Sequence, residues 1–230
     1  MRAYAAMANR TYPTFLQALS ERRFFILLVL ILFTIVLTPF LDQFIETRIL
    51  MDLFLTTIFI FIIFAIRSKR HHVIVASILA LPLIVSTWSF YFIDSRHIGL
   101  ITRIFSALFF GYAVIIILQI IVRSAEITRE IIFAAVVAYL LIALMWAFLY
   151  MILELVIPGS FSIPQSSIRQ ETMRFEYFSF ITITTLGYGD ITPLSDRASA
   201  LALLEALIGK IYLVVLVAWL VGMHVSRRTR

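Results

Sequence analysis

One short segment of the chain combines residue types that can bind a bare cation through their backbone. It is Thr184–Asp190, with the sequence TTLGYGD. A cation stripped of its hydration shell needs oxygen ligands, and rings of backbone carbonyls can supply them. Successive carbonyls in extended chain alternate in direction, so aligning several of them requires left-handed residues, and glycine takes that conformation without steric cost. Gly187 and Gly189 stand at alternate positions, as this arrangement needs.

The length of this segment suits several ions in single file. Thr185–Gly189 extends about 15 Å at roughly 3.3 Å per residue. Ions bound in a row would repel one another onward, and the Thr185 hydroxyl would add an oxygen at the inner end. The predicted backbone ligands are those of Thr185, Leu186, Gly187, Tyr188 and Gly189.

The residues just before this segment are apolar and aromatic, but too few to cross a membrane. Phe175–Ile183 has about nine residues, whereas a spanning helix needs about 20. We predict a half-length helix that enters the membrane and returns as extended chain, which is a re-entrant loop. Such backbone is tolerated at membrane depth only where it is buried in protein or lines water. The C-terminal end of the helix carries about half a negative charge, which favours a cation beyond it.

The composition of the whole chain indicates a membrane protein. Its 230 residues are 62% hydrophobic and 14% charged, against about 45–50% and about 25% in soluble domains. One soluble core would leave large apolar patches in water. We therefore predict an all-α membrane protein with six transmembrane helices plus the re-entrant pore helix and loop. The apolar runs lie near residues 24–41, 49–66, 73–93, 98–122, 131–153 and 197–223.

The distribution of basic residues predicts the orientation. With the N-terminus in the cytoplasm, the inner segments hold 12 of the 19 lysines and arginines, and the outer segments hold 5. Positive residues favour the cytoplasmic side, so we expect a multi-pass cell-membrane protein with both termini inside. The chain has no cysteine, and we see no nucleophile–base set or metal-ligand cluster. We therefore expect neither an enzyme nor a disulfide scaffold.

The TTLGYGD string, its short preceding helix and the two flanking runs resemble the filter region of tetrameric six-transmembrane-helix potassium channels of the prokaryotic type. The resemblance implies a homotetramer around a central pore, because each chain holds one such loop. It also implies passive potassium flux, with potassium ions as the permeant ligand and no other cofactor. In this family Thr184 and Asp190 would support the filter, with Asp190 bracing it from behind. Leu186 replaces the usual valine, which leaves the backbone ligands unchanged but alters the packing behind them.

The resemblance also divides the chain into modules. Residues 1–122 would hold the N-terminal segment and a four-helix peripheral module, 123–130 a cytoplasmic linker, 131–225 the pore module and 226–230 a short tail without a regulatory domain. A voltage sensor needs arginine at every third position of its fourth helix, and here only Arg103 lies inside that run. Moving one charge through 100 mV is worth about 2.3 kcal/mol. We therefore expect weak or no voltage dependence.

The last apolar run contains a glycine and two ionisable residues whose presence within a transmembrane helix needs a physical explanation. Gly209 lies 20 positions after Gly189, where the family often has a gating hinge, and close helix packing is the alternative reason. Glu205 and Lys210 are ionisable at membrane depth, where charge is costly and usually functional. Bacterial relatives often have glutamine in place of Lys210. We expect Lys210 either to pair with Glu205 of its own or a neighbouring chain, or to face the cavity and repel potassium.

Two further groups of charged residues lie in the predicted loops, one on the inner side and one on the outer side. A basic loop on the predicted inner side sets the topology, and anionic-lipid binding at Arg67, Lys69 and Arg70 is the sharper alternative. Four acids at the predicted outer mouth would raise the local cation concentration, and the alternative for those other than Asp190 is an ordinary solvated surface. These acids are Glu171, Glu176, Asp190 and Asp196.

Other functions remain open at this point. A non-conducting or auxiliary channel-like membrane sensor would keep the fold, and Lys210 is the feature that encourages this reading. A less selective monovalent cation channel is a second alternative, because of Leu186. A coupled transporter is less favoured, since matched broken helices in two repeats would be expected.

Overall fold

The computed structural model describes residue 19 and residues 21–41, 47–67, 69–89, 96–124, 126–163 and 171–228. Helices occupy all six predicted apolar runs, and a seventh, shorter helix occupies the predicted re-entrant stretch. The helices are α3 (Arg23–Leu41), α4 (Thr47–Ala65), α5 (Arg70–Ser89), α6 (Arg96–Arg123), α7 (Arg129–Val156), α8 (Glu171–Ile183) and α9 (Asp196–Arg228). Two short strands are β1 (Phe161–Ser162) and β2 (Thr192–Pro193).

Three helices in the described residues are long and apolar enough to cross a membrane. They are Gly99–Arg123, Arg129–Val156 and Asp196–Trp219. The described parts of the first three helices are apolar but shorter, at Arg23–Leu37, Leu55–Ala65 and Arg70–Ser86. The mostly helical chain predicted from the apolar runs is therefore confirmed, whereas the number of membrane spans stays a prediction.

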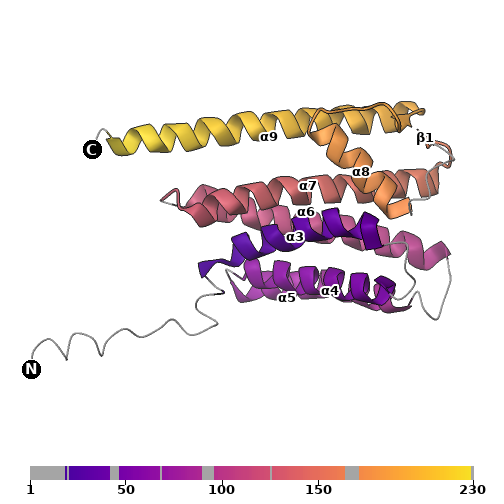
Figure 1. The fold of residues 1–230 in the computed structure, drawn as a ribbon, viewed down its shortest axis with the longest axis horizontal. Coiled ribbons are helices and arrows are strands. Elements are labelled where there is room, and N and C mark those ends of the chain that lie inside the picture. The colour runs from indigo at the N-terminus through magenta and orange to yellow at the C-terminus, as the bar shows by residue number, and fades with distance from the viewer. Residues whose placement is uncertain are drawn as a thin grey trace, which may run out of the picture.

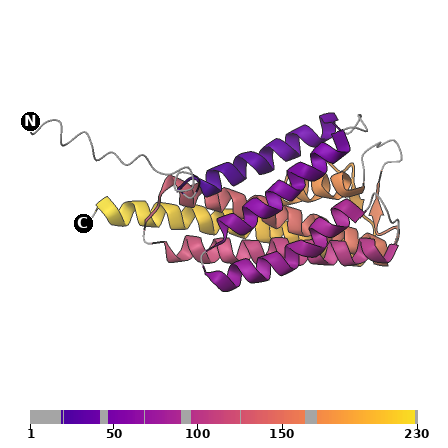
Figure 2. The same ribbon diagram turned by 90° about the horizontal axis from the view of Figure 1, so that it is seen from below.

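The long helices run roughly side by side in one bundle (Figures 1 and 2). The first four, α3 to α6, lie on one side of α7, and α9 lies on the other side. The short α8 crosses obliquely between α7 and α9, and the chain after it returns along α9 toward β1 (Figure 1). The start of α3 and the end of α9 lie at the same end of the bundle.

A short connection keeps helices α3 to α6 beside helix α7 of the same chain. Only residues 124–128 separate α6 from α7, and the Thr128 side chain caps α7 by accepting a hydrogen bond from the backbone N–H of Ile131. Five residues cannot carry the module to a distant partner. The rings of Phe110 and Phe148 stack at 5.7 Å between centroids, joining α6 to α7. Helices α3 to α6 thus share a core with α7.

The second half of α7 forms the platform on which α8 rests. Tyr150 is fully buried, and its ring meets those of Phe161 and Phe178 edge-on at 5.4 Å and 5.0 Å. Phe175 packs edge-on against Phe161 at 5.2 Å. Aromatic pairs of this geometry stabilise a core beyond their buried area. This cluster fixes the height and tilt of α8, and therefore the position at which the TTLGYGD segment begins.

Candidate functional site

The chain reverses direction immediately after α8. The carbonyl of Phe180 accepts the N–H of Thr184 at 3.2 Å, and the carbonyl of Ile181 accepts the N–H groups of Leu186 and Gly187 at 2.9 Å and 3.1 Å. The last carbonyls of a helix have no partner within it, so these bonds satisfy them and fold the following residues back. The chain reversal predicted after the short apolar stretch is therefore present, and its place within a membrane stays a prediction.

Left-handed residues alternate along the returning segment. Gly187 has φ 51° and Gly189 has φ 77°, as the glycine spacing predicts. Thr185 also lies in the left-handed region, with φ 60°. A non-glycine residue in this conformation costs about 1–2 kcal/mol, so its presence indicates that the surrounding bonds impose it. Left-handed residues at every second position form the backbone pattern expected to align carbonyls on one side of the segment.

The segment is open on the surface of the single chain. Residues 184–190 are all exposed, and the side chains of Leu186 and Tyr188 are 55% and 69% accessible. Asp190 is exposed too, and in the described part of the chain it has no hydrogen-bond partner. Its bracing role therefore stays a prediction. One chain supplies a single row of oxygens, which cannot surround an ion.

The outer end of the segment is fixed by a small sheet. Strands β1 and β2 pair antiparallel, with Phe161 opposite Pro193, and the N–H of Leu194 donates to the Ser160 carbonyl at 2.8 Å. The Glu154 carboxylate at the end of α7 accepts the backbone N–H groups of Gly159 and Phe161 at 2.8 Å and 3.2 Å. The segment thus enters and leaves through anchored backbone.

The inner end is held by a close approach of α9 to α8. A Cβ atom added to Gly209 would lie 2.6 Å from Cγ1 and 2.7 Å from the carbonyl oxygen of Ile183. The same carbonyl accepts the Tyr139 hydroxyl at 2.8 Å, which adds α7 to the contact. Close helix packing, one of the two reasons predicted for Gly209, therefore requires glycine at this position. A hinge role for Gly209 stays a prediction.

Glu205 is fully buried and joins three helices. Its carboxyl contacts the Tyr150 hydroxyl on α7 and the Ser179 hydroxyl on α8. The Ser179 hydroxyl also lies 2.6 Å from the carbonyl oxygen of Ala143. No ion pair joins Glu205 to Lys210 within the described chain, and the Lys210 side chain is exposed. The predicted ion pair between Glu205 and Lys210 of the same chain is therefore not formed.

We infer a protonated Glu205 from the number of hydrogens that this cluster can supply. The Ser179 hydroxyl has one proton but two neighbouring acceptors if the carboxyl is ionised, namely Glu205 and the Ala143 carbonyl. A protonated Glu205 donates to Ser179, Ser179 donates to Ala143, and Tyr150 donates to the other carboxyl oxygen. Each contact then has one proton, which is the arrangement expected of a buried network. No signal in the sequence pointed to Tyr150 or Ser179, because both lie in apolar runs far from position 205.

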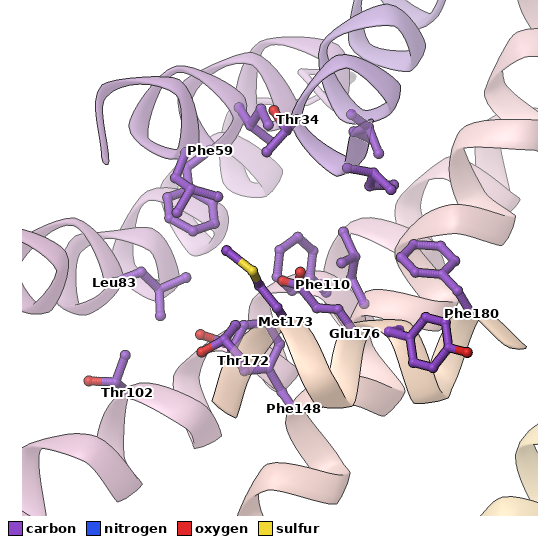
Figure 3. A pocket seen from close by; sticks show the side chains of 17 residues that line it. Thr34, Phe59, Leu83, Thr102, Phe110, Phe148, Thr172, Met173, Glu176 and Phe180 are labelled. Carbon is purple, nitrogen blue, oxygen red and sulfur yellow. The ribbon is translucent and has the colours of Figure 1, made fainter. Parts of the chain in front are cut away.

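Two of the four acids predicted at the outer mouth are placed differently or not described. Glu176 lines a pocket between α8 and the peripheral helices (Figure 3), so its prediction as a mouth residue is wrong. The side chain of Glu171 lies outside the described residues, and Asp196 is exposed at the start of α9. The prediction failed because Glu176 lies on the side of α8 that faces the peripheral helices, and the sequence does not show which helices surround a short helix. Among the described residues, no group of three His, Cys, Asp or Glu is placed to hold a metal.

Comparison with known families identifies the part of the chain that carries this site. Residues 126–225 match a family model described as an ion channel. The match runs from the α6–α7 connection to α9, and it includes α8 and the TTLGYGD segment. No curated protein and no solved structure matches the chain. This part of the chain, 100 of its 230 residues, is therefore similar to an ion-channel domain, and three of the described helices are long and apolar enough to cross a membrane.

Proposed function

We propose that this protein is a potassium-selective channel, in which four copies surround a pore and potassium passes down its gradient without any catalysed reaction. The observation that carries the proposal is the alternation of left-handed residues at Thr185, Gly187 and Gly189. Potassium would be coordinated by the carbonyls of residues 185–189 and by the Thr185 hydroxyl. Oxygen ligands of this kind replace the hydration shell of the ion.

The exposed surface of α9 supports the assembly of several copies. One face of α9 packs on α7 and α8, with Glu205 and Gly209 buried there. The other faces of α9 carry large apolar side chains that no described residue covers. Neighbouring copies of the chain would cover some of them, and the others would line the proposed pore. Cyclic symmetry is the usual solution for identical chains around one axis. The exposed residues are Leu203, Leu204, Leu207, Ile211, Leu213, Val214, Val215 and Val217.

The proposed topology has six spans and both termini in the cytoplasm of a cell membrane. Two features of the structure support it. Six helices occupy the six apolar runs, and the start of α3 lies at the same end of the bundle as the end of α9 (Figure 1). The basic residues concentrate at that end, as cytoplasmic ends do.

Thallium uptake into liposomes tests the proposal and its main rival together. We expect the purified protein to admit thallium, a potassium substitute, and Lys210→Gln to raise the uptake rate several-fold, because four ammonium groups near the inner end of the filter oppose cation entry. Empty liposomes are the control. A parent protein and a Lys210→Gln variant that are both impermeable would contradict the proposal. A silent parent with a conducting variant would favour the non-conducting sensor.

Voltage dependence is expected to be weak or absent. Arg103 lies inside α6, whereas Arg96 and Arg123 lie at its two ends. Four such charges give at most about 9 kcal/mol per 100 mV for a tetramer, even if each crosses the whole field. A current–voltage series in planar bilayers checks this expectation. Steep activation over a few tens of millivolts would contradict it.

Anionic lipid is proposed as a partner at the inner end. Arg67, Lys69 and Arg70 are exposed around the α4–α5 turn. A nearby hollow of about 320 Å³ adds support, because Arg23, His72 and Arg123 line it together with Gln119 and Ser124. Basic groups between helices on the cytoplasmic side suit anionic head groups.

A further inference from the structure

A pocket of about 360 Å³ separates α8 from the peripheral helices (Figure 3). Its wall is mostly aromatic and aliphatic, and it draws on every helix from α3 to α8. The rings of Phe59, Phe110, Phe148 and Phe180 face it from α4, α6, α7 and α8. Ligand pockets usually have this size and this largely apolar lining, with a few placed polar groups.

The pocket contains a carboxyl and a buried hydroxyl that have no partner among the residues that the structure describes. Glu176 is the one charged side chain among the described lining residues, and it points into the pocket from α8 (Figure 3). Ser106 on α6 is 3% exposed. Within the described ranges, neither the Glu176 carboxyl nor the Ser106 hydroxyl makes a hydrogen bond or ion pair. The hydroxyl of Thr34 differs, because it donates to the Leu30 carbonyl at 2.9 Å.

A carboxyl without a partner among phenylalanine rings lowers the stability of the fold. Its presence therefore indicates a binding function. Ionisable groups at membrane depth are rare and usually serve a functional site. A bare metal ion is a poor occupant, because hard cations take six or more oxygen ligands, and this pocket offers one carboxyl and a few hydroxyls. A lipid acyl chain would fill the apolar part but would leave Glu176 without a partner.

We propose that this pocket binds an amphiphilic organic cation, a protonated amine with an apolar or aromatic body. The ammonium group would donate to Glu176 and to the Ser106 oxygen, since an ammonium has up to three donors. The body of the ligand would pack against Phe110 and Phe148, where aromatic faces also attract a cation. Charge and apolar area are then matched within one ligand.

The location of the pocket gives the ligand an effect on the filter. Glu176 lies on α8, whose last residue, Ile183, directly precedes the TTLGYGD segment. A ligand bound between α8 and α6 joins the helix that supports the filter to the peripheral helices. The proposed amine therefore modulates the pore from the side, outside the path of the ions.

Direct binding tests this inference without any need for conduction, so it can fail or succeed independently of the proposed channel function. The probe is fluorinated phenylbutylamine, followed by fluorine NMR on the full-length protein in lipid nanodiscs. Fluorinated phenylbutanol, which has the same shape without the charge, is the matched ligand. We expect saturable binding of the amine alone, weakened about tenfold or more by Glu176→Gln.

Two further variants keep the test decisive. Glu126→Gln makes the same change in the α6–α7 connection, outside the pocket, and leaves binding unchanged. Ser106→Leu fills the pocket from α6 and reduces binding even if Glu176→Gln proves unstable. Equal binding of the amine and the alcohol would overturn the proposal. Amine binding that survives both Glu176→Gln and Ser106→Leu would overturn it too.

Discussion

Replacing Gly209 by alanine is expected to abolish thallium uptake and to destabilise the protein by about 1–3 kcal/mol, as overpacking does. The new Cβ would meet the Ile183 carbonyl oxygen at 2.7 Å, which is backbone and cannot rotate away. That carbonyl also accepts the Tyr139 hydroxyl at 2.8 Å. Helix α9 must therefore move away from α8, and the filter loses its support at Thr184. The thermal unfolding temperature and the uptake rate measure the two effects.

Gly111→Ala is the matched control for this variant. Gly111 lies on α6, and a Cβ there would meet the Met145 sulfur at 3.2 Å. A methionine side chain is flexible and adapts to such a change, so we expect less than about 0.5 kcal/mol of destabilisation and normal uptake. Equal behaviour of the two alanine variants would contradict the packing role of Gly209. Wild-type uptake by Gly209→Ala would also exclude the hinge.

The second large effect is expected at Glu205, where the replacement decides the outcome. Glu205→Leu leaves the buried Tyr150 hydroxyl without an acceptor, which costs about 1–3 kcal/mol. Glu205→Gln keeps every bond of the protonated network, since its amide donates to Ser179 and its oxygen accepts from Tyr150. We expect Glu205→Gln to stay within about 1 kcal/mol of the parent in unfolding free energy, with normal thallium uptake.

The comparison of the two replacements also tests the proton assigned to Glu205. Both remove a charge if the parent carboxyl is ionised, so both would then be damaging. Glu126→Gln, at an exposed position in the α6–α7 connection, shows the effect of the same change without burial. Destabilisation by Glu205→Gln as large as that by Glu205→Leu would show that the parent carboxyl is charged.

These two sites belong to one arrangement that holds the TTLGYGD segment. Gly209 and Tyr139 fix its inner end through Ile183. Glu205 fixes the middle of α8 through Ser179. The β1–β2 pair fixes its outer end. The strained Thr185 conformation lies between these anchors, which explains how a chain exposed on one side keeps left-handed residues at alternate positions.

Much of the fold was predictable from apolar length alone. Helices of about 20 residues are the lipid-compatible form of such runs, and the observed helices begin and end close to the predicted runs. The last helix continues to Arg228, into the segment predicted as a tail, because helical backbone needs no apolar residues outside the membrane. Spacing of Gly187 and Gly189 also predicted the left-handed residues correctly.

The contacts between helices were not predictable from the sequence. Local spacing carries no information on which residues meet across 26 or 55 positions, as Ser179 and Tyr150 do with Glu205. The positive φ of Thr185 was missed for a different reason. Threonine disfavours that conformation, and the bonds of Ile181 to the following residues impose it. The surroundings of Glu176 were missed because residue spacing within one short helix does not show which other helices pack around it.

The most direct test of the central claim is the reversal potential of the purified protein in planar bilayers with unequal potassium and sodium on the two sides. The backbone oxygens of residues 185–189 are proposed to replace water around potassium alone. We predict that the reversal potential changes with the potassium gradient and does not change with the sodium gradient. A current that reverses at a potential independent of the potassium gradient would contradict the account.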